Sequence, residues 1–353
     1  MERRWRILGG CGLIAGIFLF VQLGALALVQ PFESAGYQAV EDPSDPTNSL
    51  MYVGAILVAT AVMLLAFRYD VDQLIRGLIV FSAAWLSLYV FQVLVPPVLT
   101  YAGLNVVAVL LALGLGTALL VYPEWYVIDA AGAVMGAAAA GLFGISFGIL
   151  PSLVLLTVLA VYDAISVYGT EHMLALASGV MDMRVPIVLV VPLRLTYSYL
   201  EDGGPDPLAD ESAEDESAAD APNGPEVDDE GEAADEGPEG PGDDESESPL
   251  DREALFIGLG DAIIPAVLVA SAGFFLEGVP TVAIPGLATP TLPAVTAMAG
   301  TLVGLAILLR MVLAGRAHAG LPLLNGGAIL GYLVGALASG LTLAQALGVA
   351  TFL

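Results

Sequence analysis

Three aspartates lie inside long apolar stretches of the sequence: Asp129, Asp163 and Asp261. A carboxylate costs free energy in hydrocarbon, and it usually marks a functional or interhelical site. Asp163 stands near the end of one apolar stretch and Asp261 near the beginning of the next. If both stretches are membrane-spanning helices, the two acids lie at matched depth on antiparallel neighbours, about 10 Å from one face at helical rise. The two side chains can therefore face each other.

Such a pair has a definite chemistry. Two carboxyl groups held close cannot easily both ionise, so they share one proton. The ionised group can take a proton from water while the protonated group polarises a peptide carbonyl. This is aspartic-protease chemistry, and it needs neither a metal nor a nucleophilic side chain. Gly258 and Gly260 would let a substrate backbone approach and would permit a local break in the helix.

The spacing of the two acids leaves other functions open. The same pair could be structural, or it could relay protons in an ion or proton translocator. Inverted repeats would favour the translocator, and the sequence has no convincing repeat. The third acid, Asp129, follows Trp125 and Tyr126, and such aromatic residues are typical of the membrane–water interface. We therefore expect Asp129 to reach lipid headgroups and to take no direct part in the chemistry.

Other residues that could do chemistry lack the context they need. The letters G-x-S-x-G at 144–148 place Ser146 at the centre of a nucleophile elbow, but the strand–turn–helix context is missing. His172 and His318 are expected on the other side of the membrane from Ser146, and they lack metal-ligand spacing. Cys11 is the only cysteine. We therefore predict no metal site and no cofactor, and we expect helix packing by small residues at 144–148.

The composition is that of a polytopic membrane protein, because 57% of the residues are hydrophobic and the mean hydropathy is +0.83. Nine apolar stretches can span, or nearly span, a bilayer core, which takes about 20 helical residues. We therefore predict an all-α membrane protein with nine transmembrane helices. The predicted spans are 7–29, 49–67, 77–98, 102–121, 126–147, 149–169, 254–276, 291–313 and 320–342. A tight turn must join the fifth and sixth spans.

The arginines orient this arrangement, because positive charge concentrates on the cytoplasmic side of membrane proteins. All of them fall on one side of the nine spans: Arg3, Arg4, Arg6, Arg68, Arg76, Arg184, Arg194, Arg252, Arg310 and Arg316. We therefore expect a multi-pass protein of the cell membrane with a cytoplasmic N-terminus and an extracellular C-terminus. Both Asp163 and Asp261 then lie near the cytoplasmic face.

A strongly acidic segment divides the chain. Residues 201–250 hold 21 of the 37 acidic residues and no basic one, and they are mostly Asp, Glu, Gly, Pro, Ser and Ala. We expect this segment to be disordered, because it cannot bury enough apolar surface. The predicted parts are therefore a six-span part at 1–169, a cytoplasmic extension at 170–200, the acidic loop at 201–250, and a three-span part at 251–353. With no basic patch, nucleic-acid binding is not expected.

The extension contains a stretch at 185–192 that differs from the predicted spans. It is short, rich in β-branched residues and bounded by Pro186 and Pro192. These features favour an exposed strand over a helix, and an apolar strip on the membrane surface is the alternative. An unwound substrate segment could pair with such a strand by β-augmentation.

The chemistry-bearing residues carry a resemblance. Tyr162-Asp163 followed by Gly258-Leu259-Gly260-Asp261 resembles the YD and GxGD motifs of the presenilin and signal peptide peptidase family. Nine spans with a long hydrophilic loop after the sixth are also similar to that family, and the stretch around 171–192 resembles its archaeal members. The resemblance implies an intramembrane aspartyl protease in which Asp163 and Asp261 are catalytic. Prepilin peptidases also use a GxGD aspartate, but they are shorter.

The third motif of the family, Pro-Ala-Leu at the start of the last span, is similar to Pro322-Leu323-Leu324 here, with leucine in place of the central alanine. The resemblance implies that this segment lines the active site. It also implies substrate-binding roles for Tyr162, Gly258, Leu259, Gly260, Pro322, Leu323 and Leu324. The implied partners are transmembrane helices of substrate proteins within the lipid bilayer. The sequence does not indicate an oligomeric state.

Overall fold

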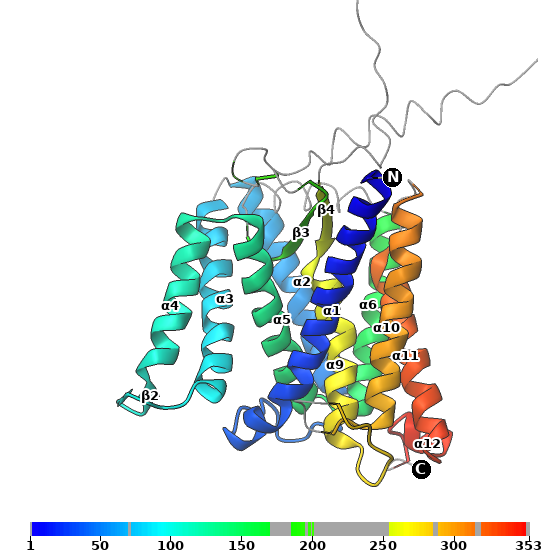
Figure 1. Ribbon diagram of the computed structural model, residues 1–353. Coiled ribbons are helices and arrows are strands. Elements are labelled where there is room, and N and C mark those ends of the chain that lie inside the picture. Colours follow the sequence, from blue (N-terminus) through cyan, green and yellow to red (C-terminus); the bar gives the residue numbers. More distant parts are fainter. Residues whose placement is uncertain are drawn as a thin grey trace, which may run out of the picture.

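The computed structural model is a bundle of helices with two small sheets (Figure 1). It describes residues 2–69, 72–169, 185–194, 197–198, 200, 254–284, 289–314 and 319–350. The helices are α1 Glu2–Ser34, α2 Thr47–Arg68, α3 Asp72–Leu94, α4 Val106–Val121, α5 Trp125–Ser146, α6 Ile149–Gly169, α9 Leu259–Phe275, α10 Leu292–Val312, α11 Gly320–Ala338 and α12 Leu343–Ala346. The strands are β1 Thr100–Tyr101, β2 Leu104–Asn105, β3 Val188–Pro192 and β4 Ala254–Gly258.

The described residues contain six helices that are long and apolar enough to cross a membrane: α1, α3, α5, α6, α10 and α11. Three shorter apolar helical segments are also present: α4, α9 and the part of α2 from Thr47 to Met63. The protein is therefore a mostly helical membrane protein. The acidic loop predicted at 201–250 lies outside the described residues.

Two predicted spans are wrong at their beginnings, and the fold is not all-α. The first five residues of the span predicted at 254–276 form β4, and α9 begins only at Leu259. The span predicted at 102–121 begins at Val106 as α4, because residues 100–105 form the hairpin of β1 and β2. Hydropathy could not separate β4 from α9, since a short apolar run has the same composition in either conformation. The hairpin instead carries turn and cap residues, Gly103 with a positive φ and the N-cap Asn105, which the hydropathy pattern overlooked.

The tight turn between α5 and α6 is present, and Gly148 explains it. The Gly148 N–H donates to the carbonyl of Pro43 at 2.7 Å. A Cβ atom on Gly148 would lie 2.9 Å from that same carbonyl oxygen, so a larger residue cannot approach so closely. The preceding Ser146 is 1% exposed and accepts the N–H of Ala39 at 3.0 Å. The serine at 144–148 is therefore a buried residue with a structural hydrogen bond.

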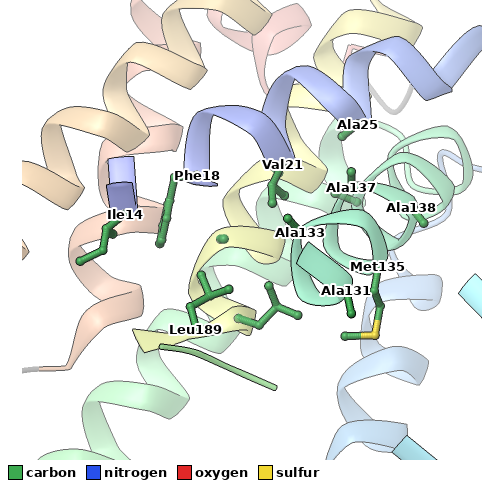
Figure 2. Packing of buried hydrophobic residues seen from close by; sticks show 14 of the residues in the cluster. Ile14, Phe18, Val21, Ala25, Ala131, Ala133, Met135, Ala137, Ala138 and Leu189 are labelled. Carbon is green, nitrogen blue, oxygen red and sulfur yellow. The ribbon is translucent and has the colours of Figure 1, made fainter. Parts of the chain in front are cut away.

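The core is centred on α5, which packs against α1, α9 and β3. Figure 2 shows Val21 and Ala25 of α1 beside Ala133 and Ala137 of α5. Small residues on α5 bring the helices together, as TM-helix interfaces commonly require. Gly144 is one example, because a Cβ atom there would collide with Ala270 of α9.

A second close contact joins α10 and α11 along their length, and we call it the glycine seam. It is formed by Gly300 and Gly304 of α10 with Gly327, Gly331 and Gly335 of α11. A Cβ atom on Gly300 would collide with the carbonyl oxygen of Gly327, and one on Gly327 with that of Gly300. The two backbones therefore touch, which fixes the position of α11 against α10.

The exposed strand expected at 185–192 is present only over Val188–Pro192, as β3, and it is buried: its three central residues are at most 1% exposed, because β3 packs against α5 and pairs with β4 of the same chain. The pairing is antiparallel, with Val188 opposite Gly258 and Pro192 opposite Ala254. The sheet lies at the end of the bundle at which α1 begins, and α12 lies at the opposite end (Figure 1). Because β4 runs directly into α9, the sheet is joined to the first turn of that helix without a loop.

Candidate active site

Asp163 lies near the end of α6, six residues before Gly169. Its side chain is 8% exposed, and its Oδ2 accepts the backbone N–H of Leu321 at 3.0 Å. Leu321 is the second residue of α11. The first N–H groups of a helix have no intrahelical partner and attract negative charge. The beginning of α11 therefore provides a partner for a carboxylate that is otherwise surrounded by apolar helices.

Asp261 lies in the first turn of α9, directly after β4. Gly258 is the N-cap residue of this helix and is exposed, as is Gly260. The Asp261 carboxyl group lies beside Gly320, because a Cβ atom on that glycine would be 3.0 Å from Asp261 Oδ2. A side chain at position 320 would thus press on the carboxyl group.

The first turn of α11 brings the two acids together. Gly320 lies beside Asp261 and Leu321 binds Asp163, so consecutive residues of one helix contact both carboxyl groups. The helices that carry the two acids, α6 and α9, pack on each other and on α11. Two carboxyl groups in this relation can share one proton, which is the requirement for activating water against a peptide bond.

The other site residues predicted from the sequence differ in how exposed they are. Tyr162, Gly258 and Gly260 are exposed, and Pro322 and Leu323 are half-buried. Leu259 and Leu324 are buried, at 2% and 0% exposure. Leu259 packs beside Gly132 and Gly136 of α5. The exposed and half-buried residues can meet a substrate, whereas the two buried leucines shape the site from behind.

The sequence suggested that Asp129 faces lipid headgroups, but its side chain faces the protein interior. It is 6% exposed, and its Oδ1 accepts the backbone N–H of Val190 in β3 at 2.8 Å. The expectation that it reaches lipid headgroups is therefore wrong. Trp125 and Tyr126 were misleading, because nearby aromatic residues do not show which way Asp129 faces. Its side chain points to the neighbouring strand β3.

Sequence reasoning also missed Asn325, which follows the Pro322-Leu323-Leu324 segment. Its side chain is fully buried, and its Nδ2 donates to the carbonyl of Leu156 in α6 at 2.9 Å. This bond ties α11 to the helix that carries Asp163. The signal was an amide within an apolar span, since buried polar groups in membranes usually bind across helices.

No cluster of three or more His, Cys, Asp or Glu side chains suited to a metal occurs among the described residues. His172 and His318, which the sequence gave no ligand role, lie outside those residues.

The chain is similar to known proteins over most of its length. The family described as "Signal-peptide peptidase, presenilin aspartyl protease" matches residues 15–341. Two crystal forms of a presenilin family intramembrane aspartate protease are similar in structure. In the C222 form, identity is 33% over 94% of this chain and 99% of that chain, with a TM-score of 0.58. In the P2 form, identity is 30% over 92% and 96%, with a TM-score of 0.55.

No curated protein matches the chain. The family match covers most of the sequence, and the structural match extends over nearly the whole of both chains. This chain belongs to the signal-peptide peptidase and presenilin family, and it is a multi-pass intramembrane aspartyl protease.

Proposed function

We propose that Asp163 and Asp261 are the catalytic pair of this protease. The observation that supports this assignment is their shared contact with the first turn of α11, through Leu321 N–H and Gly320. One carboxyl group is ionised and takes a proton from water, and the other is protonated and polarises the scissile carbonyl. The resulting hydroxide equivalent attacks the carbonyl carbon to give a tetrahedral intermediate. The carboxyl group that took the proton from water then gives it to the amide nitrogen, and the C–N bond breaks to release the amine and the new carboxyl end.

The substrate is a transmembrane segment of another membrane protein, and it must unwind because a continuous helix shields its own peptide bonds. Gly258 and Gly260 expose backbone on either side of Leu259, next to Asp261. We assign substrate contact to these glycines and to Tyr162, Pro322 and Leu323. Leu259 and Leu324 support the site through packing, since both are buried.

An unwound substrate would be held as an extra strand at the sheet, by β-augmentation. The sequence suggested the strand at 185–192 as the acceptor, but β3 already pairs with β4 on one edge and its Val190 N–H binds Asp129. We therefore place the substrate strand alongside the end of β4. The exposed Gly258 at that end is three residues from Asp261, so an added strand would run into the catalytic pair.

We propose that nine helices span the membrane, with α2, α4 and α9 joining the six long ones. The 17 residues of α9 extend about 25 Å, and the five residues of β4 add about 16 Å. The predicted six-span part at 1–169 and three-span part at 251–353 follow from this count, as do the connecting parts at 170–200 and 201–250. The arginine distribution favours a cytoplasmic N-terminus.

The catalytic assignment is tested with purified protein in detergent and a generic transmembrane peptide. Discrete fragments are expected by mass spectrometry from the unmodified protein. Asp163→Asn and Asp261→Asn should each abolish cleavage, and both should keep the melting temperature close to that of the unmodified protein. Appreciable activity in either variant would overturn the shared-proton pair.

The orientation is tested by single-cysteine labelling in a Cys11→Ser background. A cysteine at Ser217 should react with an impermeant reagent only after the cells are opened. Thr289 is exposed between α9 and α10, and a cysteine there should react on intact cells whose surface layer admits the reagent. The reverse pattern would place the N-terminus outside.

A further inference from the structure

We propose that Asp129 is a positioning residue for Asp261, and that it acts by accepting the backbone N–H of Val190. The inference rests on the proposed catalytic role of Asp261. Asp129 Oδ1 accepts that N–H at 2.8 Å, whereas Oδ2 is buried with no hydrogen-bond partner among the described residues. A buried carboxyl group with so little compensation is costly in a membrane protein. We infer from this cost of burial that the hydrogen bond from Val190 N–H to Asp129 has a specific role.

The hydrogen bond uses the edge of β3 that faces away from β4. Leu259 N–H donates to the Ile187 carbonyl, and the same register places Leu189 opposite Ile257. Hydrogen-bonded and non-hydrogen-bonded pairs alternate along an antiparallel ladder, so Val190 directs its N–H outward. Asp129 thus anchors β3 to α5 without competing for a bond of the sheet.

The same face of α5 also contacts the residues on both sides of Asp261. Asp129, Gly132 and Gly136 share this face, because they are three and four residues apart. A Cβ atom on Gly132 would lie 3.5 Å from Leu189 and 3.6 Å from Leu259. One on Gly136 would lie 3.4 Å from Leu259 and 3.3 Å from Ile263. The same face of α5 therefore packs against both β3 and the first turn of α9.

The position of Asp261 follows from these contacts. The Val190 bond fixes where β3 sits on α5, and the ladder fixes β4 against β3. The end of β4 is Gly258, and α9 begins at the next residue, so no loop can absorb a shift. If Asp129 loses its acceptor, β3 and β4 can slide on α5, and the Asp261 carboxyl group moves relative to Asp163.

The test compares two side chains of similar size at position 129. Asp129→Asn keeps an oxygen where Oδ1 lies, so kcat should stay within about twofold, as the single-bond energetics suggest. Asp129→Leu has no acceptor, and kcat should fall about tenfold or more. If both variants kept full activity, the hydrogen-bond acceptor would not matter and the proposal would be overturned. If both lost activity to the same extent, the effect would come from the charge of Asp129, and the proposal would also be overturned.

The partner side of the bond gives an independent test. Val190→Pro removes the N–H from the outward edge, where proline is tolerated, and Val190→Ala keeps it. Cleavage by Val190→Pro should fall about as far as by Asp129→Leu, and the double variant should lose no more, because both remove one bond. Additive losses, or equal activity of the proline and alanine variants, would overturn the proposal.

Two further measurements keep the outcomes separate. If Asp129→Leu does not fold, the comparison of Val190→Pro with Val190→Ala decides the question. Asp261→Asn is assayed alongside, and activity in that variant would refute the catalytic pair whatever the Asp129 variants do. A loss confined to the Asp129 and Val190 variants that lack the bond would support the positioning role.

Discussion

Glycine occurs both along the glycine seam and along the outer helices α2, α3 and α4, but its surroundings differ in the two regions. In the seam, Cβ atoms on Gly300, Gly327 or Gly331 would collide with backbone carbonyl groups of the facing helix. On the outer helices, Cβ atoms on Gly54 and Gly114 would meet nothing within 4 Å.

The burial of whole helices follows the same division. In the most apolar window of α5, 72% of the residues are buried, whereas in that of α3 only 22% are. The outer helices also expose many large apolar side chains, as expected for surfaces that face lipid: Leu57, Val58, Val62, Leu65, Leu74, Leu78, Phe81, Trp85, Leu110, Leu111, Leu113 and Leu120. A substitution should therefore be judged by the region that receives it, and four predictions test this difference.

The largest effect is expected from Gly300→Ala in the seam. The new Cβ would collide with the Gly327 carbonyl, and a backbone group cannot rotate away, so we expect a loss of about 3 kcal/mol in stability. Cleavage should fall with it, because α11 carries the contacts to both aspartates. The measurement is thermal unfolding in detergent together with the cleavage rate.

The matched control for the seam is Gly114→Ala in α4, where the added methyl group has open space. Its stability should be unchanged or higher by up to about 1 kcal/mol, because alanine favours helix more than glycine. If the two variants unfolded alike, the contrast between the regions would be wrong.

The second prediction concerns the first turn of α11. Gly320→Ala places a Cβ atom 3.0 Å from Asp261 Oδ2 and 3.4 Å from Leu308. We expect kcat to fall about tenfold because the carboxyl group is displaced, with little change in melting temperature. Gly326→Ala on the same helix has nothing within 4 Å and should keep full activity. Similar kcat values for the two variants would argue against contact between Gly320 and the catalytic group.

A smaller effect is expected from Asn325→Leu, which removes the hydrogen bond to the Leu156 carbonyl. Interhelical bonds of this kind contribute about 0.6–1 kcal/mol in membranes, so denaturant unfolding should show a loss of that size. Cleavage should fall only a few-fold. Ser82→Ala is the control, because its hydroxyl group binds Leu78 within the same helix. A loss as large as that of Gly300→Ala would mean that Asn325 has a further role.

The smallest effect is expected from deletion of 203–248. The segment is acidic and poor in apolar residues, so by composition it adds little to the packing of the membrane helices. Insertion and cleavage should stay close to those of the full chain, measured by membrane fractionation and peptide digestion. A deleted protein that inserts normally but does not cleave would show that this segment takes part in catalysis.

Much of the fold could be read from the sequence because its signals are local. Long apolar runs predicted the helices, and the β-branched stretch bounded by Pro186 and Pro192 predicted β3. The beginning of α9 could not be read, since β4 is as apolar as the helix that follows it. The beginning of α4 was marked by Gly103, which has a positive φ, and by the N-cap Asn105, but the hydropathy pattern overlooked both. Asp163 and Asp261 stood out because a carboxyl group in an apolar run is rare.

Only the tertiary structure decided which groups meet. Asp129 binds Val190 across 61 positions, and Asn325 binds Leu156 across 169. The pairing of the seam glycines of α10 with those of α11 likewise came only from the structure. Hydropathy reports how much of a segment avoids water, and residue spacing reports which side chains share a face. Neither reports which face of another helix lies opposite, because that depends on how all the helices pack together.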